Sequence, residues 1–131
     1  MKSLGIGPGD EVICPANSFI ASAWSIVAVG AKPVFCDVGD DFLISLENIS
    51  NLLTKSTKAI MAVHLTGKLC YMNNLSKFCK DNDLFLLEDS AQAIGAKDIH
   101  QICQELENNG CKVTTKPKTM KNSTTGLAFV E

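Results

Sequence analysis

Strand-like apolar runs alternate with helix-like segments through the first ninety residues of the chain. The run LFLLE at 84–88 is apolar until its last residue, and the runs before it are rich in Val, Ile and Ala. Such runs are too apolar to face water and suit parallel strands buried on both faces. The alternation therefore predicts an α/β fold, a mainly parallel sheet with helices on both faces. The expected strands cover residues 11–14, 33–38, 58–63 and 84–88.

The segments between these runs carry helix signals. We expect the first helix to begin after Asn17 or Ser18 as its cap and to stop at Gly30. Trp24 within it is expected in the core, and Ser45 should cap the second helix. The three expected helices cover residues 18–30, 46–53 and 72–82. After residue 97 the character changes to an amphipathic helix-like segment, a short apolar run and a polar, Lys-rich end.

Composition excludes several functional classes. The net charge is -2 and the basic residues are scattered apart from a run at 116–121, so nucleic acid is a poor default partner. No apolar stretch approaches the roughly 18 residues that a membrane helix needs, and the start has no secretory apolar region. The cytoplasm is therefore the default location. The six cysteines include no C-x-x-C pair, which favours buried structural thiols over a metal site.

Polar side chains follow the expected strands where each strand ends. The exits carry Asp37, His64 and the adjacent acids Glu88 and Asp89. In parallel α/β sheets ligands bind at the carboxyl ends of the strands, so a site is expected there. His64 alone is more typical of a buried structural histidine than of a catalytic one. Glu88 should point to the opposite side from Asp89 and is also expected to be structural.

Three motifs carry a resemblance to a known family. They are LGIGPGDEVICPANSFIASAWSIVAVGAKPVFCDV, TKAIMAVHLTG and LLEDSAQAIGA, and they extend almost continuously over residues 4–96. Together they resemble the pyridoxal phosphate-dependent sugar aminotransferases of the DegT/DnrJ/EryC1/StrS type, which have fold type I. A flavodoxin-like domain is a weaker alternative, because the segment CPANSF after the first strand has no glycine to hold a phosphate.

The resemblance implies roles for three residues. It places Asp89 against the protonated pyridine nitrogen of pyridoxal phosphate, where a carboxylate keeps the ring cationic and able to accept electrons. It implies that Gln92 reaches the phenolic oxygen of the ring and that Phe19 stacks on the face of the ring. The local sequence alone also allows a helix N-cap for Asp89, a solvated surface amide for Gln92 and core packing for Phe19.

The resemblance also implies a catalytic lysine that holds the cofactor aldehyde as a Schiff base. Lys121 is the candidate, because it begins KNSTTG and lies thirty-two positions after Asp89. Its surroundings depart from the family pattern, since neither a Phe-Ser-Phe nor a Glu-Gly-Gly flanks it, and a solvated loop lysine is an equal alternative. Lys116 and Lys118 are weaker candidates because neither begins this motif.

The expected function follows from the family. It is transfer of an amino group, with glutamate as the donor, to a nucleotide-linked keto sugar in polysaccharide or secondary-metabolite biosynthesis, and a complete enzyme would be a homodimer. We expect residues 1–96 to be part of the cofactor domain and residues 97–131 to be a diverged or damaged continuation. A fragment is expected, because family members have a phosphate-binding turn before Leu4 and a second domain after the lysine. A truncated, non-catalytic α/β module is the alternative.

Overall fold

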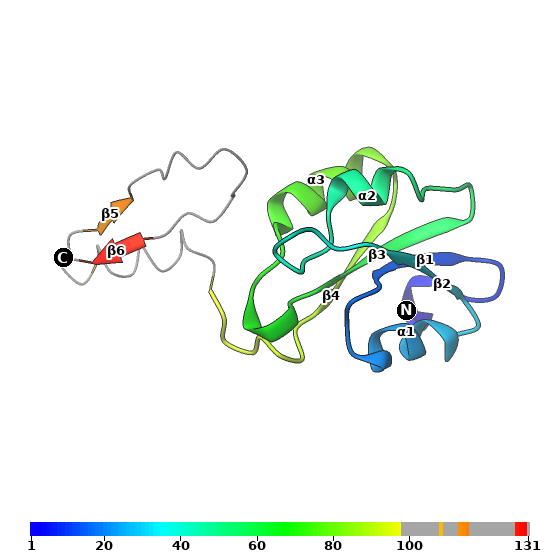
Figure 1. Ribbon diagram of the computed structural model, residues 1–131. Helices are drawn as coiled ribbons and strands as arrows, with labels where there is room; N and C mark the ends of the chain where they lie inside the picture. Colours follow the sequence, from blue (N-terminus) through cyan, green and yellow to red (C-terminus); the bar gives the residue numbers. More distant parts are fainter. Residues whose placement is uncertain (98–107, 109–112, 116–127, 131) are drawn as a thin grey trace. The chain divides into compact units, whose positions relative to one another are not determined.

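The computed structural model describes residues 1–97, 108, 113–115 and 128–130, which belong to two compact units. The first unit, Met1–Ile94, contains a four-stranded sheet and its covering helices (Figure 1). The second unit, Gly95–Glu131, contains β5 (Val113–Thr115), which pairs antiparallel with β6 (Ala128–Val130). The candidate site lies within the first unit.

The sheet of the first unit is parallel throughout and has the order β2-β1-β3-β4. The second strand lies on one side of β1 and the third on the other, so the order reverses between β1 and β3. The strands are β1 (Glu11–Pro15), β2 (Lys32–Cys36), β3 (Thr57–Val63) and β4 (Phe85–Asp89). The helices are η1 (Lys2–Leu4), α1 (Ile20–Val27), α2 (Leu46–Ser50), η2 (Leu65–Gly67) and α3 (Met72–Asp81).

Helices cover both faces of this sheet, which confirms the expected α/β architecture. Figure 1 shows α2 and α3 on one face and α1 on the other. Alternate residues of each strand supply two separate cores: Ile13 and Ile60 pack on the α2 and α3 side, whereas Val12 and Met61 pack with Ile26 of α1. Each central strand is therefore buried on both faces, as its apolar sequence requires.

The first helix begins later than predicted. Its N-cap is Phe19, which has extended backbone angles, and the expected caps Asn17 and Ser18 are wrong. The Ser18 hydroxyl lies 3.3 Å from the carbonyl oxygen of Pro15, so it donates backward instead of accepting a helix N–H group. Gly30 lies beyond the helix and takes the left-handed φ of 83° that favours glycine after a helix end.

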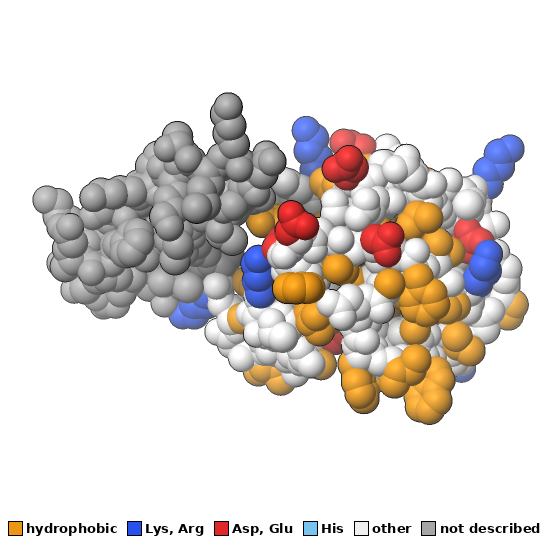
Figure 2. All heavy atoms as spheres, viewed as in Figure 1, with side chains coloured by type: hydrophobic (Ala, Val, Ile, Leu, Met, Phe, Trp, Pro, Cys, Tyr) orange, Lys and Arg blue, Asp and Glu red, His pale blue; other side chains and the backbone are white. Residues whose placement is uncertain are grey.

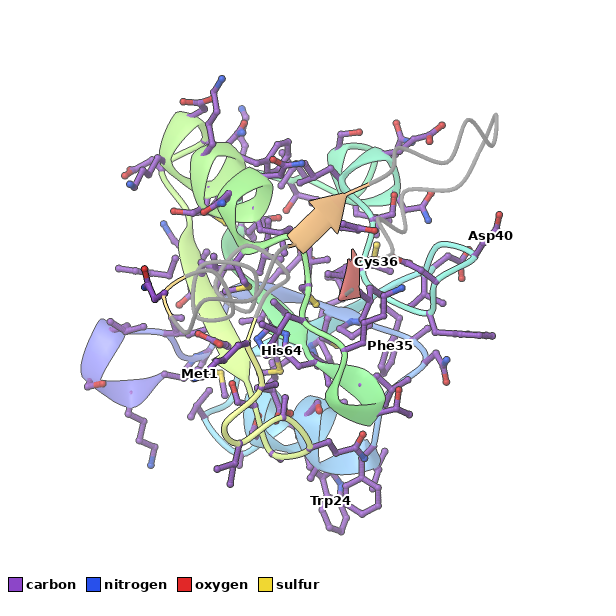
Figure 3. All side chains as sticks on the ribbon, turned by 90° about the vertical axis from the view of Figure 1, so that its left-hand side faces the viewer. Met1, Trp24, Phe35, Cys36, Asp40 and His64 are labelled. Atoms are coloured by element: carbon purple, nitrogen blue, oxygen red, sulfur yellow. The ribbon has the colours of Figure 1, made fainter. Side chains whose placement is uncertain are left out.

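The expectation that Trp24 lies in the core is wrong. Its exposed fraction is 69%, and Figure 3 shows the ring pointing away from the ribbon. Helix α1 packs the face with Ala23 and Ile26 against the sheet, and leaves Ile20 and Val27 exposed beside Trp24. Figure 2 shows hydrophobic side chains gathered on this part of the viewed face. Because α1 is apolar nearly all round, its pattern does not reveal which side packs.

The last strand of the sheet is less buried than its sequence suggests. Among the described residues, β4 pairs only with β3 and forms an edge of the sheet. Phe85 is 45% exposed, so the expectation of a strand buried on both faces is wrong for β4 in this unit. Its carboxyl end still lies beside the end of β3, because the pairing runs from Ala59 with Phe85 to Val63 with Asp89.

A buried histidine links the ends of β3 and β4. His64 is 1% exposed, and its Nε2 lies 2.8 Å from Oε1 of Glu88 (Figure 3 labels His64). The N–H group of Cys70 donates to Nδ1 over 3.1 Å, so Nε2 carries the proton and donates to the carboxylate. This bond, with a weaker contribution from the Ser90 hydroxyl, holds the pKa of Glu88 below its ordinary value of 4.5 although burial opposes it.

The described cysteines are buried thiols. All four are free, and burial raises the pKa of Cys14, Cys36 and Cys70 to about 11. Cys103 and Cys111 lie outside the described residues. Within the part of the chain that the structure describes, no helix has the length and apolar character needed to cross a bilayer.

Two substitutions on one helix test this packing. Trp24→Ala should change the free energy of unfolding by less than about 0.5 kcal/mol, because the ring has little contact with the sheet. Ile26→Ala should lower it by about 2–5 kcal/mol, because it leaves a cavity in a closed core. Urea unfolding followed by circular dichroism measures both. An equal loss for the two variants would contradict the assigned packing of α1.

The His64–Glu88 pair should make stability depend on pH. Because the pKa of Glu88 is lowered by folding, the contribution of the pair is fully present above the unfolded value near 4.5 and is lost as the pH falls through the lower folded value. Glu88→Gln keeps a neutral acceptor for His64 and removes this titration. The difference in free energy of unfolding between wild type and Glu88→Gln should therefore shrink on acidification, and a constant difference would contradict it.

Candidate active site

A cavity of about 430 Å³ lies at the carboxyl ends of β3 and β4, beside the start of α1. Three parts of the chain line it: the first turns of α1 with Phe19, the end of β3 with Leu65, and residues 88–92, which comprise the end of β4 and the turn after it. The cavity is therefore next to the reversal of strand order between β1 and β3, where ligands bind in open α/β sheets. Asp37, at the exit of β2, is not among the lining residues.

The cavity brings together three of the four residues proposed from the sequence. Phe19, Asp89 and Gln92 all line it, although 70 positions separate Phe19 from Asp89. The ring of Phe19 is 69% exposed, so it is not occupied in core packing. Lys121 lies outside the described residues. The carboxylate, the amide and the aromatic ring thus face one space.

Asp89 is the last residue of β4 and is half-buried. Its Oδ2 accepts a hydrogen bond of 2.8 Å from the Ser22 hydroxyl, and its Oδ1 accepts one of 3.2 Å from the N–H group of Ala91. Each carboxylate oxygen has two lone pairs, so both keep capacity for a donor in the cavity. No helix begins within residues 90–97, all of which the structure describes, so Asp89 does not cap one.

Ser22 was not identified from the sequence. It is 4% exposed and lies on the first turn of α1, on the side that faces the sheet. A polar residue at a buried position of a largely apolar helix needs a partner, and this was the available signal. The sequence could not identify the partner, because Asp89 is 67 positions away.

Gln92 follows β4 within a turn, not within a helix. The N–H group of Ala93 donates to the carbonyl of Ser90, and this turn carries Gln92 back toward η2. There its Oε1 accepts a hydrogen bond of 2.7 Å from the N–H group of Thr66. Its side chain is exposed at the wall of the cavity and is held at one end, unlike a freely solvated amide.

The adjacent acids have different partners. Glu88 is bound by His64 and Ser90, whereas Asp89 is bound by Ser22 and Ala91. Glu88 therefore uses its carboxylate in a link within the fold, in agreement with the structural role expected for it. Both acids line the cavity, but the side-chain partner of Asp89 is Ser22 of α1, so the carboxylate of Asp89 is held on the α1 side.

Known proteins match most of this chain in sequence. The sequence model of the DegT/DnrJ/EryC1/StrS aminotransferase family matches residues 1–111. GDP-perosamine synthase of Vibrio cholerae is 44% identical over 96 residues, which are 72% of this chain and 26% of that protein. A second relative, from Acidithiobacillus ferrooxidans, is named UDP-N-acetyl-3-dehydro-alpha-D-glucosamine 3-aminotransferase. It is 42% identical over 112 residues, which are 85% of this chain and 30% of that protein.

Solved structures of aminotransferases share the fold. NtdA of Bacillus subtilis, solved with bound cofactor PMP, superposes with a TM-score of 0.71 at 38% identity, over 76% of this chain and 23% of that one. DesV of S. venezuelae, solved with a ketimine intermediate, gives a TM-score of 0.69 at 38% identity, over 70% and 25% of the two chains. This chain spans about a quarter of the length of the relatives it matches. It belongs to the DegT/DnrJ/EryC1/StrS aminotransferase family.

Proposed function

We propose that this chain provides part of the cofactor site of a pyridoxal phosphate-dependent sugar aminotransferase. The observation that carries the proposal is the half-buried carboxylate of Asp89 at the wall of a cavity that Gln92 and Phe19 also line. Family membership and the relatives solved with PMP, the amine form of this cofactor, support the choice of pyridoxal phosphate.

The described residues fit this cofactor. When bound, pyridoxal phosphate supplies a ring that accepts the electrons of a broken substrate bond. Asp89 would hold the proton on the ring nitrogen, because both its oxygens are fixed by donors and still have free lone pairs. Gln92 would donate to the phenolic oxygen, and the exposed ring of Phe19 would stack on the face of the cofactor.

The substrates proposed are glutamate as amino donor and a nucleotide-linked keto sugar as acceptor. Several relatives support the acceptor by their names, among them the GDP-perosamine synthases and a dTDP-4-dehydro-2,3,6-trideoxy-D-glucose 4-aminotransferase of Saccharopolyspora spinosa. A relative from Streptomyces fradiae is named for L-glutamine and 2-deoxy-scyllo-inosose, so both substrates vary among these proteins. We also propose that the enzyme is a homodimer and that it acts in the cytoplasm, in polysaccharide or secondary-metabolite biosynthesis.

Lys121 is the proposed lysine for cofactor attachment. Mixing the chain with pyridoxal phosphate should give a visible absorption band that borohydride removes, and Lys121→Ala should abolish the band. Lys116→Ala and Lys118→Ala are matched controls in the same basic run, and both should keep it. A band that survives in Lys121→Ala would contradict this assignment, and a folded chain without any band would favour the non-catalytic module.

The role of Asp89 can be separated from that of its neighbour. Asp89→Asn should raise the dissociation constant for pyridoxal phosphate at least about tenfold, because a hydrogen bond to a charged group contributes about 1.5–3 kcal/mol. Glu88→Gln is the matched control and should leave binding nearly unchanged, because Glu88 is bound to His64. Absorbance titration measures both constants. Equal losses would show that the acid pair acts only on the fold.

A further inference from the structure

The turn after β3 has an unusual backbone. Thr66 lies within η2 with φ 56° and ψ 24°, in the left-handed region that β-branched residues rarely occupy. Its hydroxyl donates to the carbonyl of Leu65 over 2.7 Å, which supports this conformation locally. Gly67 also has a left-handed φ, of 83°. Such strained conformations persist where surrounding contacts fix them, and they often serve a site.

The strained turn gives one specific contact to the cavity wall. The N–H group of Thr66 donates to Oε1 of Gln92 over 2.7 Å. A backbone N–H group can only donate, so the atom of the amide that faces it must be the oxygen. This contact therefore decides the orientation of the Gln92 amide, and the NH₂ group is the half that remains to serve as a donor.

The turn is itself fixed to the sheet. The N–H group of Gly67 donates to the carbonyl of His64 over 3.2 Å, and the N–H group of His64 donates to the carbonyl of Asp89 over 3.1 Å. His64 is buried and also holds Glu88, so the base of the turn cannot shift without breaking these bonds. The donor of Thr66 therefore has a defined position relative to both Asp89 and Gln92.

We propose that the Thr66 turn is a positioning element for Gln92. The N–H group of Thr66 holds the amide oxygen of Gln92 and so excludes the flipped orientation, in which that oxygen would face the ligand and repel an anion. The NH₂ group is thereby directed to an anionic oxygen of a ligand in the cavity. This step rests on the function proposed above, which identifies the oxygen as the phenolic oxygen of pyridoxal phosphate. Thr66 acts through its backbone and Gln92 would touch the cofactor.

The bond itself can be tested without any cofactor. The measured quantity is the temperature coefficient of the chemical shift of the Thr66 amide proton in the ¹⁵N-labelled 131-residue chain, which is small for a hydrogen-bonded proton. Gln92→Ala removes the acceptor and should raise this coefficient to that of a solvated group. Gln92→Glu keeps an acceptor and should leave the coefficient small. The Gly67 amide proton is an internal control, because its partner is the carbonyl of His64, and it should not change. A Thr66 amide proton that is unaffected by Gln92→Ala would overturn the proposal.

The consequence for binding needs a second measurement. Pyridoxal phosphate should shift the side-chain NH₂ signals of Gln92, and Gln92→Glu should raise its dissociation constant at least about tenfold because the donor is lost. A merely structural Gln92 would give no such shift of its NH₂ signals, whereas the raised constant alone does not show contact, because Gln92→Glu also adds a charge that repels an anion. If the cofactor gives its visible band while the NH₂ signals stay unmoved, this inference alone fails. If no band forms in a folded chain, the proposed function fails.

Discussion

The parallel pairing of β4 with β3 determines where the candidate site lies. The register places Val63 beside Asp89, and the N–H group of His64 extends the ladder to the carbonyl of Asp89. A shift of one residue would exchange the sides on which Glu88 and Asp89 point. It would turn the carboxylate of Asp89 away from Ser22 and the cavity. The chemistry proposed for this chain therefore depends on the register of one strand pair.

Much of this arrangement could be predicted from local sequence. The alternation of apolar runs and helical segments sets the fold class, because parallel strands need both faces covered. Once the strands are parallel, their exits meet at one edge, and this brings Asp89 close to the start of α1. The roles of Phe19, Asp89 and Gln92 came from the resemblance to a family and remain predictions, although all three line one cavity.

The remaining features depend on contacts that no local pattern encodes. Trp24 is exposed because a largely apolar helix can turn more than one side to the sheet, and α1 presents Ser22, Ala23 and Ile26 there. Ser22 could be recognised as a buried polar residue, but its partner is fixed by tertiary structure. The contact of Thr66 comes from its backbone and from a left-handed conformation, and a threonine in the sequence signals neither.

The acid pair shows how one strand end can serve both stability and a site. Two adjacent carboxylates in a common environment would repel each other and compete for the same donors. Here strand alternation separates them, so His64 binds Glu88 while Ser22 binds Asp89. The histidine link fixes the strand end from one side, and the serine holds the other carboxylate toward the cavity. Two carboxylates of the same chemistry thus acquire different roles through their neighbours, the principle by which enzymes assign distinct tasks to paired acids.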